Sequence, residues 1–171
     1  MSDAWATVTT LAGRHVRLVP LRMEHVDGLR AATDEASAST WYTSVPAPAD
    51  VGAYVEAALR KQAGGGSMAF AVLDAGGAPC GSTRFYDMDR SVPRLQVGYT
   101  WYARRVQRTG LNTEAKRLLL GHAFETLGCA AVGFQTSWFN HASRAAIERL
   151  GAKQDGVIRN HLRHADGSLR D

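Results

Sequence analysis

Residues 104–124 read RRVQRTGLNTEAKRLLLGHAF, and the character of the chain changes there at a single glycine. Basic residues precede Gly110, and after it apolar residues recur at the three- and four-residue spacing of a helix with one buried face. A helix N-terminus offers N–H groups without intrahelical partners and the positive end of the helix dipole. The stretch therefore predicts a helix over residues 110–127. Before it lies either an anion-binding loop at residues 108–113 or an ordinary turn.

The residues before the helix favour an anion but fit neither of two common phosphate motifs. Arg104, Arg105 and Arg108 add positive charge within one turn, and Gly110 allows a ligand to approach the backbone closely. No Gly-Lys-Ser/Thr follows, which excludes a Walker loop. The second and third glycines of the dinucleotide fingerprint are also missing.

On both sides of this stretch, strand patterns alternate with helical ones. Strands are predicted at residues 15–21, 68–74, 80–88, 94–102, 130–138 and 156–164, and helices at residues 23–33, 50–62, 110–127 and 141–151. Residues 68–74 and 80–88 predict an antiparallel hairpin, whereas residues 95–137 predict a parallel crossover. This order predicts an α/β (α+β) fold, a mixed, mostly antiparallel twisted sheet with helices on both faces.

Two patterns predict which side chains face the core. Alternation along residues 94–102 places one set on a single face of the strand: Leu95, Val97, Tyr99 and Trp101. Helical spacing predicts the inner stripe of the long helix as Leu111, Ala115, Leu118, Leu119, His122 and Thr126.

Length and composition fit one domain, residues 1–171, with its own core. No apolar run approaches the roughly 18 residues of a membrane span, and the N-terminus lacks the blocks of a secretory signal. Cys80 and Cys129 lie far apart, without a CxxC or Cys/His cluster. They predict neither a metal site nor a disulfide framework and fit a cytoplasmic protein.

Further motifs carry a resemblance to a known family. QRTGLNTEAK is similar to the acyl-CoA loop of the GNAT N-acetyltransferases, Q/R-x-x-G-x-G/A, with Gln107 at the first position and Gly110 at the fourth. Asn112 stands where Gly or Ala is usual. Three further stretches, in the matching order, resemble segments of the RimJ/RimL branch, the ribosomal-protein N-acetyltransferases and their relatives: LQVGYTW, NHASRAAIERLGA and GVIRNHLRHADGSLRD.

The resemblance implies a GNAT-like fold and acetyl-CoA as co-substrate, with no metal. Backbone groups of Trp101 and Tyr102 would pair with the pantetheine arm and thioester, where two strands splay apart. Backbone N–H groups of residues 108–113 would hold the pyrophosphate, and Asn140 would hydrogen-bond the pantetheine or its phosphate. The implied cofactor-binding residues are Trp101, Tyr102, Gln107, Arg108, Thr109, Gly110, Leu111, Asn112, Thr113 and Asn140.

Two catalytic positions depart from the family. Many relatives have, at the position of Ile147, a tyrosine that acts as the general acid. The resemblance to the branch would place Ser143 near the sulfur, as a thiolate-stabilising group. Ser143 would equally suit helix capping. Gln96 stands where the branch often has a glutamate base. His161 is the candidate replacement, because imidazole titrates near neutral pH.

Other solutions for the base stay open. A chain of water molecules would serve without a dedicated residue, and three further side chains could act: Asp87, Asp89 and His164. Trp41 and Tyr42 lie in the loop between the first two helices, which in this fold borders the acceptor cleft. The two aromatic side chains either line an acceptor pocket or pack into the core with no role in binding.

The leading hypothesis is an acetyl-CoA-dependent N-acetyltransferase that acts on a protein N-terminus or a small primary amine. A non-catalytic acyl-CoA-binding module is the alternative that the missing tyrosine and glutamate favour. A ribosome- or RNA-binding domain rests only on the net charge of +4 and pI of about 9.4. The resemblance implies a further strand after residues 156–164, which the sequence up to Asp171 does not contain. This predicts either an exposed sheet edge, with a homodimer through it, or a chain truncated after Asp171.

Overall fold

A six-stranded sheet forms the centre of the molecule. The computed structural model describes residues 3–38, 40–43, 45–164 and 166–171. The strands lie in chain order and are antiparallel except for the last pair, which is parallel. They are β1 (Leu11–Ala12), β2 (Val16–Pro20), β3 (Ser67–Asp74), β4 (Pro79–Asp89), β5 (Arg94–Tyr102) and β6 (Ala131–Gly133). This confirms the predicted mixed, mostly antiparallel sheet.

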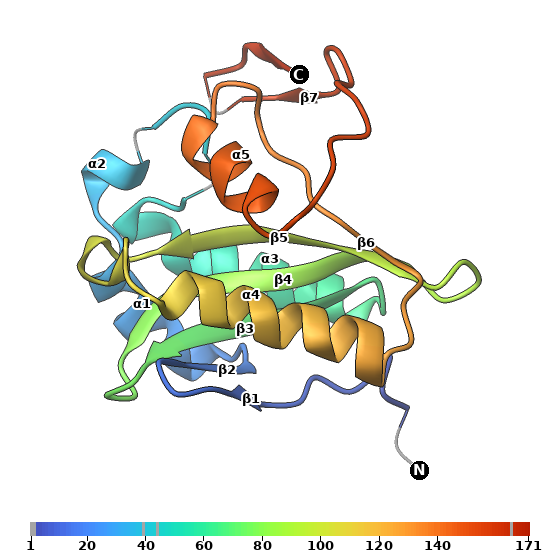
Figure 1. Ribbon diagram of the computed structural model, residues 1–171. Helices are drawn as coiled ribbons and strands as arrows, with labels where there is room; N and C mark the ends of the chain where they lie inside the picture. The colour runs from blue at the N-terminus through green and yellow to red at the C-terminus, as the bar shows by residue number, and fades with distance from the viewer. Residues whose placement is uncertain (1–2, 39, 44, 165) are drawn as a thin grey trace.

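Helices cover both faces of the sheet. Figure 1 shows α4 (Leu111–Gly121) across the front, with α1 (Val26–Ala32) and α3 (Val51–Ala63) behind it, and α5 (His141–Glu148) beyond the β5 side. The remaining turns of helix are η1 (Met23–His25), α2 (Glu35–Ala38), η2 (Pro48–Asp50), η3 (Arg104–Val106) and the π-helix η4 (His122–Thr126). The crossover through α4 joins β5 to β6 in parallel, as the sequence predicts.

Two apolar cores lie on opposite faces of the sheet. Beneath α4, Phe70, Phe85 and Leu119 are fully buried, together with Leu95 and Val97 of β5. On the other face α1 and α3 cover the second core, which contains Leu29, Val51, Val55 and Trp101. Burial of apolar side chains on both faces fixes the register of each strand, since a one-residue slip would expose them.

A bulge in β5 overturns the predicted single face of that strand. Ser82 pairs with Trp101 and Arg84 with Gly98, so two residues of β5 oppose one of β4. Tyr99 takes a φ of 52° there. The extra residue reverses the alternation, and Trp101 therefore packs beneath α1 and α3 while Val97 packs beneath α4.

The predicted inner stripe of the long helix is correct only as far as His122. The π-turns of η4 add an extra residue to the turn, and Ala123 is buried in place of Thr126, which is exposed. Gly128 has a φ of 67° and ends the segment, as expected for a glycine after a helix.

The C-terminal region differs most from the prediction. The strand expected at residues 156–164 is wrong: only β7 (Leu162–Arg163) forms there, and it pairs with β8 (Leu169–Arg170) in a separate two-stranded sheet. The strand expected at residues 130–138 shortens to β6. Within the described residues the edge strands of the main sheet are therefore β1 and β6, and the edge nearest the C-terminal region is β6 rather than the predicted last strand.

Candidate functional site

Strands β5 and β6 pair over three residues and then diverge. The pairs are Arg94 with Ala131, Leu95 with Val132 and Gln96 with Gly133. Beyond Gln96, β5 continues to Tyr102 bonded to β4 alone, while residues 134–138 leave the sheet. We call this divergence the fork. It leaves backbone groups on one side of β5 without a strand partner.

The loop that follows β5 holds the N-terminus of α4. Arg108 has a φ of 58°, a left-handed conformation, and the Thr109 hydroxyl binds the carbonyl of Val106 at 2.7 Å. The same hydroxyl accepts a bond from the N–H of Leu111. No residue in the described chain accepts a hydrogen bond from the N–H of Asn112, a first-turn residue of α4. Such a loop suits an anion.

The three arginines of this region are not equivalent. Arg104 pairs with Asp34 at 3.3 Å, and Arg105 forms an ion pair with Asp74. Arg108 forms no ion pair with any described residue. Only one of the three charges that the sequence suggested for the loop is therefore free to meet a ligand.

The predicted cofactor residues carry buried polar atoms without partners. They are Trp101 Nε1, the Tyr102 hydroxyl and Asn112 Oδ1, as judged within the described chain. Burial raises the pKa of Tyr102 above its usual range, so the hydroxyl stays protonated. Gln107 donates to the Tyr102 carbonyl at 2.8 Å and ties the loop to β5. The Asn112 oxygen and the free N–H group of the same residue fit a polar, anionic cofactor such as CoA. Trp101 packs in the core beneath α1 and α3, so its unpartnered Nε1 lies on the other face of the sheet.

Asn140 caps α5. Its side-chain oxygen accepts a bond from the N–H of Ser143 at 3.1 Å. The predicted capping role thus belongs to Asn140, and the half-buried Ser143 hydroxyl makes no hydrogen bond in the described structure. The structure brings Asn140 and Ser143 together and leaves the hydroxyl free for the predicted contact with sulfur.

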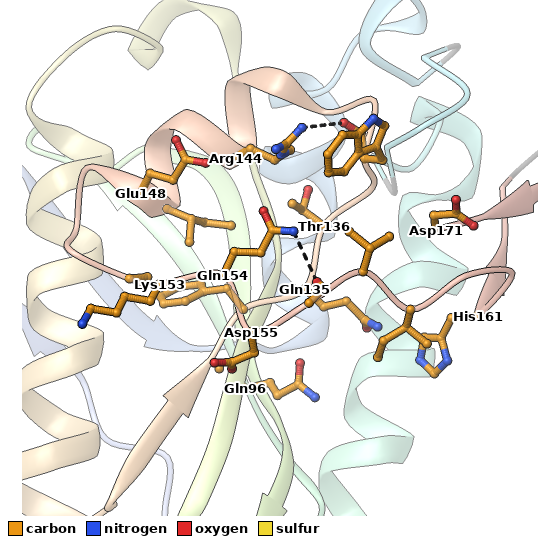
Figure 2. A pocket seen from close by; sticks show the side chains of 18 of the residues that line it. Gln96, Gln135, Thr136, Arg144, Glu148, Lys153, Gln154, Asp155, His161 and Asp171 are labelled. Carbon is orange, nitrogen blue, oxygen red and sulfur yellow. Dashed lines mark hydrogen bonds between the residues drawn. The ribbon is translucent and has the colours of Figure 1, made fainter.

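His161 lines a cavity of about 470 Å³ that borders the fork at Gln96 and Gly133 and is bounded further by α5 and the C-terminal residues. Figure 2 shows His161 on the opposite side of this cavity from Glu148 and Lys153. The backbone N–H of His161 donates a hydrogen bond to the backbone carbonyl of Arg170. Gln96 also lines the cavity, and its side chain accepts from the Tyr86 hydroxyl at 2.9 Å.

The three other base candidates have different surroundings. Asp87 is exposed, with a φ of 48°, and binds the side chain of Gln96 at 3.2 Å. The pKa of Asp89 lies below its usual value, chiefly through a hydrogen bond from Ser91. His164 is buried, and its Nε2 has no partner in the described chain.

An aromatic cluster joins distant parts of the sequence. The Trp41 ring lies 5.5 Å from Tyr42, 5.1 Å from Phe139 and 4.6 Å from His164, measured between ring centres. Trp41 is 38% exposed, so it is neither a core anchor nor free in solvent. Phe139 precedes Asn140, which places the cluster beside the start of α5.

The sequence reasoning did not predict two buried basic side chains. Arg84 is 3% exposed, and its guanidinium lies 4.5 Å from the rings of Tyr54 and Tyr99. Lys116 is 7% exposed and points from α4 to Thr100. Lys116 precedes Leu119 of the predicted inner stripe by three residues, and that spacing was a signal in the sequence that could have placed it on the inner face of the helix.

These features define an acetyltransferase fold with a fork between β5 and β6, and the chain belongs to the GNAT acetyltransferase family. Residues 15–153 match the family described as the Acetyltransferase (GNAT) domain. The resemblance drawn from the sequence motifs is confirmed. Among the described residues, no group of three or more His, Cys, Asp or Glu could hold a metal ion. No helix of the described chain is both long and apolar enough to cross a membrane.

Known relatives agree with this assignment. YdaF of Bacillus subtilis (strain 168), provisionally named a ribosomal N-acetyltransferase, is 35% identical over 92 residues, 50% of this chain and 46% of that protein. The chain therefore spans about half the length of that relative. A provisionally named acetyltransferase from T. thermophilus is 31% identical with a TM-score of 0.84, over 97% of this chain and 87% of that one.

A more distant structure shares the fold. RimJ of Mycobacterium smegmatis, solved in complex with CoA-disulfide, is 19% identical with a TM-score of 0.80. The similarity covers 99% of this chain and 86% of RimJ.

Proposed function

We propose that this protein transfers the acetyl group of acetyl-CoA to a primary amine by direct attack on the thioester. One observation carries the proposal: the fork in the sheet opens beside the N-terminus of α4, where the N–H of Asn112 has no described acceptor. A chain with a long polar arm and a pyrophosphate would use both features at once. The CoA found in RimJ of the same fold supports this choice of ligand.

In this proposal, different residues of the chain contact different parts of acetyl-CoA. Backbone N–H groups of residues 108–113 hold the pyrophosphate, and the free backbone side of Trp101 and Tyr102 pairs with the pantetheine arm. Acetyl-CoA supplies the activated acetyl group. Asn140 donates its amide N–H to the arm, and the Ser143 hydroxyl donates to the sulfur as negative charge develops there.

The acceptor in this proposal is the N-terminal amine of a ribosomal protein, and a small primary amine is the alternative. The provisional name of YdaF supports the first. The aromatic cluster of Trp41, Tyr42, Phe139 and His164 would contact the acceptor residue beside α5.

A non-catalytic acyl-CoA-binding module is the second candidate, because Gln96 cannot accept a proton and Ile147 cannot donate one. Thiol release from acetyl-CoA, measured with ribosomal-protein N-terminal peptides and with small amines, separates the two. Turnover on any amine supports the enzyme. CoA binding by calorimetry without turnover on any amine supports the module, and absence of CoA binding contradicts both.

A further inference from the structure

Lys116 is a buried amine that none of the predicted roles uses. It lies in the second turn of α4, four residues after Asn112, and is 7% exposed. Lysine is almost never this buried unless a partner or a function compensates for the lost hydration. Within the described chain no carboxylate forms an ion pair with it.

The contacts of Lys116 reach both sides of the fork. Its Nζ donates to Thr100 Oγ1 at 2.8 Å, and Thr100 belongs to the bulge of β5. The same Nζ lies 5.7 Å from the centre of the Phe134 ring, and Phe134 is the first residue after β6. The amine therefore sits where the two segments diverge, facing β5 with one contact and the departing chain with the other.

The Thr100 hydroxyl continues the contact into the sheet. Thr83 Oγ1 of β4 lies 2.8 Å from Thr100 Oγ1, and Thr83 is fully buried. Two hydroxyls thus fix the position of an otherwise flexible side chain. Neither of them carries a charge that would hold the amine in its protonated form.

The titratable groups on the neighbouring elements do not supply a negative charge that would keep the Lys116 amine protonated. On the same helix, Glu114 accepts bonds from the backbone N–H groups of the turn before β2. In the following η4, His122 stacks on the Phe85 ring. Strand β4 carries Cys80 and β5 carries Tyr102, and burial raises the pKa of both. Residues 134–138 contain no titratable side chain.

Burial is the cause that lowers the pKa of Lys116, to about 7. A group with a pKa near the working pH is suited both to accept and to donate a proton. The pKa of a lysine falls toward neutral pH when its amine is desolvated without a nearby negative charge.

We propose that Lys116 is the proton-transfer residue of the acetyl transfer, acting as base toward the acceptor amine and as acid toward the departing thiolate. The inference rests on the proposed function, because it requires the thioester to lie in the fork. It assigns to one residue of α4 the two roles that Gln96 and Ile147 cannot fill.

The step balances without a further reactant. The acceptor nitrogen bonds to the carbonyl carbon of the thioester, and the C–S bond breaks. The proton lost by the nitrogen moves to neutral Lys116 Nζ, and the resulting ammonium gives a proton to the CoA thiolate. An amide and free CoA thiol leave, and Lys116 returns to its neutral form.

The pH dependence of kcat tests this role. The wild-type kcat at saturating substrates should rise with pH through a midpoint near 7, since only the neutral amine accepts a proton. The midpoint should be the same for acceptor amines of different pKa. Lys116→Met should lower kcat by roughly 100-fold or more and remove the midpoint, while its CoA affinity by calorimetry stays within about threefold. Lys61→Met, at an exposed lysine, is the matched control and should match the wild type.

Specific outcomes overturn the inference. Wild-type kcat and an unchanged midpoint in Lys116→Met overturn it and leave the proposed function standing. A midpoint that disappears in His161→Gln instead also overturns it. A wild-type protein that neither binds CoA nor turns over overturns both proposals. Thr100→Val removes the hydroxyl that holds the amine and should displace the midpoint without erasing it.

A direct titration keeps the test independent of whether the variant folds. The chain has three lysines, Lys61, Lys116 and Lys153, and the other two are exposed. Carbon-13 NMR of labelled lysine in the wild-type protein should show a Lys116 resonance with a midpoint near 7. A Lys116 midpoint near the roughly 10 of an ordinary lysine would overturn the inference.

Discussion

Gly110 illustrates a residue whose identity the fold does not require. Its φ of −66° suits any residue, and an added Cβ would meet the His15 ring at 3.6 Å, an ordinary contact distance. No strain and no clash therefore enforces glycine here. What remains is the space in front of the α4 N-terminus, which a ligand would occupy.

Gly110→Val should therefore weaken CoA binding without destabilising the fold. We expect at least a tenfold loss of affinity, because the side chain blocks approach to the helix N-terminus. Isothermal calorimetry measures the affinity and thermal unfolding checks the fold. Asn112→Gly is the comparison variant and should bind CoA as well as the wild type or better. Unchanged affinity in Gly110→Val would contradict the proposed pyrophosphate site.

Asp74 illustrates how a surface charge contributes to stability. The Arg105 side chain, by its hydrogen bond to this carboxylate, lowers the pKa of Asp74 below its usual 3.8, and the backbone N–H groups of Gly76 and Ala78 add to the effect. Because the folded-state pKa is depressed, the stabilisation is present above the unfolded pKa and is lost as pH falls through the folded value.

Asp74→Asn should accordingly lower the free energy of unfolding by about 1 kcal/mol at pH 7, since the charge-assisted bond is lost while the turn acceptor remains. Urea unfolding from pH 7 down to pH 2 measures the effect. The difference from the wild type should shrink below pH 4 and vanish at the lowest pH. Asp155→Asn, at an exposed carboxylate, is the control, and a pH-independent difference for Asp74→Asn would contradict this account.

At the scale of elements, the bulge in β5 and the short β6 create the site together. The bulge turns Thr100 to the side of α4 and Trp101 to the other core, and the three-residue pairing with β6 leaves the rest of β5 free. Helix α5 then begins at Asn140, whose side chain is already engaged as a cap. The proposed ligand contact of Asn140 must therefore come from its amide N–H groups.

Asn140→Ser separates these two roles. Serine caps a helix about as well as asparagine, so the free energy of unfolding should stay within about 0.5 kcal/mol of the wild type. The serine lacks the amide donors, and CoA affinity should fall severalfold if Asn140 binds the cofactor. Asn140→Ala, which loses both functions, should lose about 1 kcal/mol of stability as well. Wild-type CoA affinity in Asn140→Ser would show that Asn140 caps α5 and does not bind the cofactor.

At the scale of the whole molecule, the sheet is asymmetric. The β1 edge is a two-residue strand, whereas the β6 edge borders the 470 Å³ cavity and the exposed apolar side chains of Val157 and Ile158. Unpaired strand edges are templates for pairing with another chain.

A homodimer through the β6 edge is the corresponding prediction. Sedimentation velocity from about 1 to 100 μM, a range that brackets the affinities of ordinary protein interfaces, should show concentration-dependent association. Gln135→Pro, which removes a backbone donor just after β6, should weaken it, whereas a proline at the exposed Ala12 of the opposite edge should not. A monomer at every concentration would contradict the prediction.

Local patterns predicted much of this molecule correctly. The hairpin of β3 and β4, the strand β5, the helices α3 and α4 and the loop around Gly110 all follow from periodicity and turn residues, which act over a few neighbours. The fork was expected from the family resemblance alone. The strand predicted at residues 156–164 was wrong because alternation there shows β-propensity but not a partner, and pairing is a long-range property.

What the sequence determined by itself is most of the strands and helices before residue 134, together with the prediction of an anion-binding loop at residues 108–113, since periodicity, helix termini and glycine act locally. The tertiary structure alone decided which charges are free. It pairs Arg104 and Arg105 with aspartates on distant elements and leaves Arg108 without an ion pair among the described residues. It also buries Lys116 against Thr100, because the bulge in β5 turns that hydroxyl toward α4, and burial rather than residue type sets the pKa of a lysine.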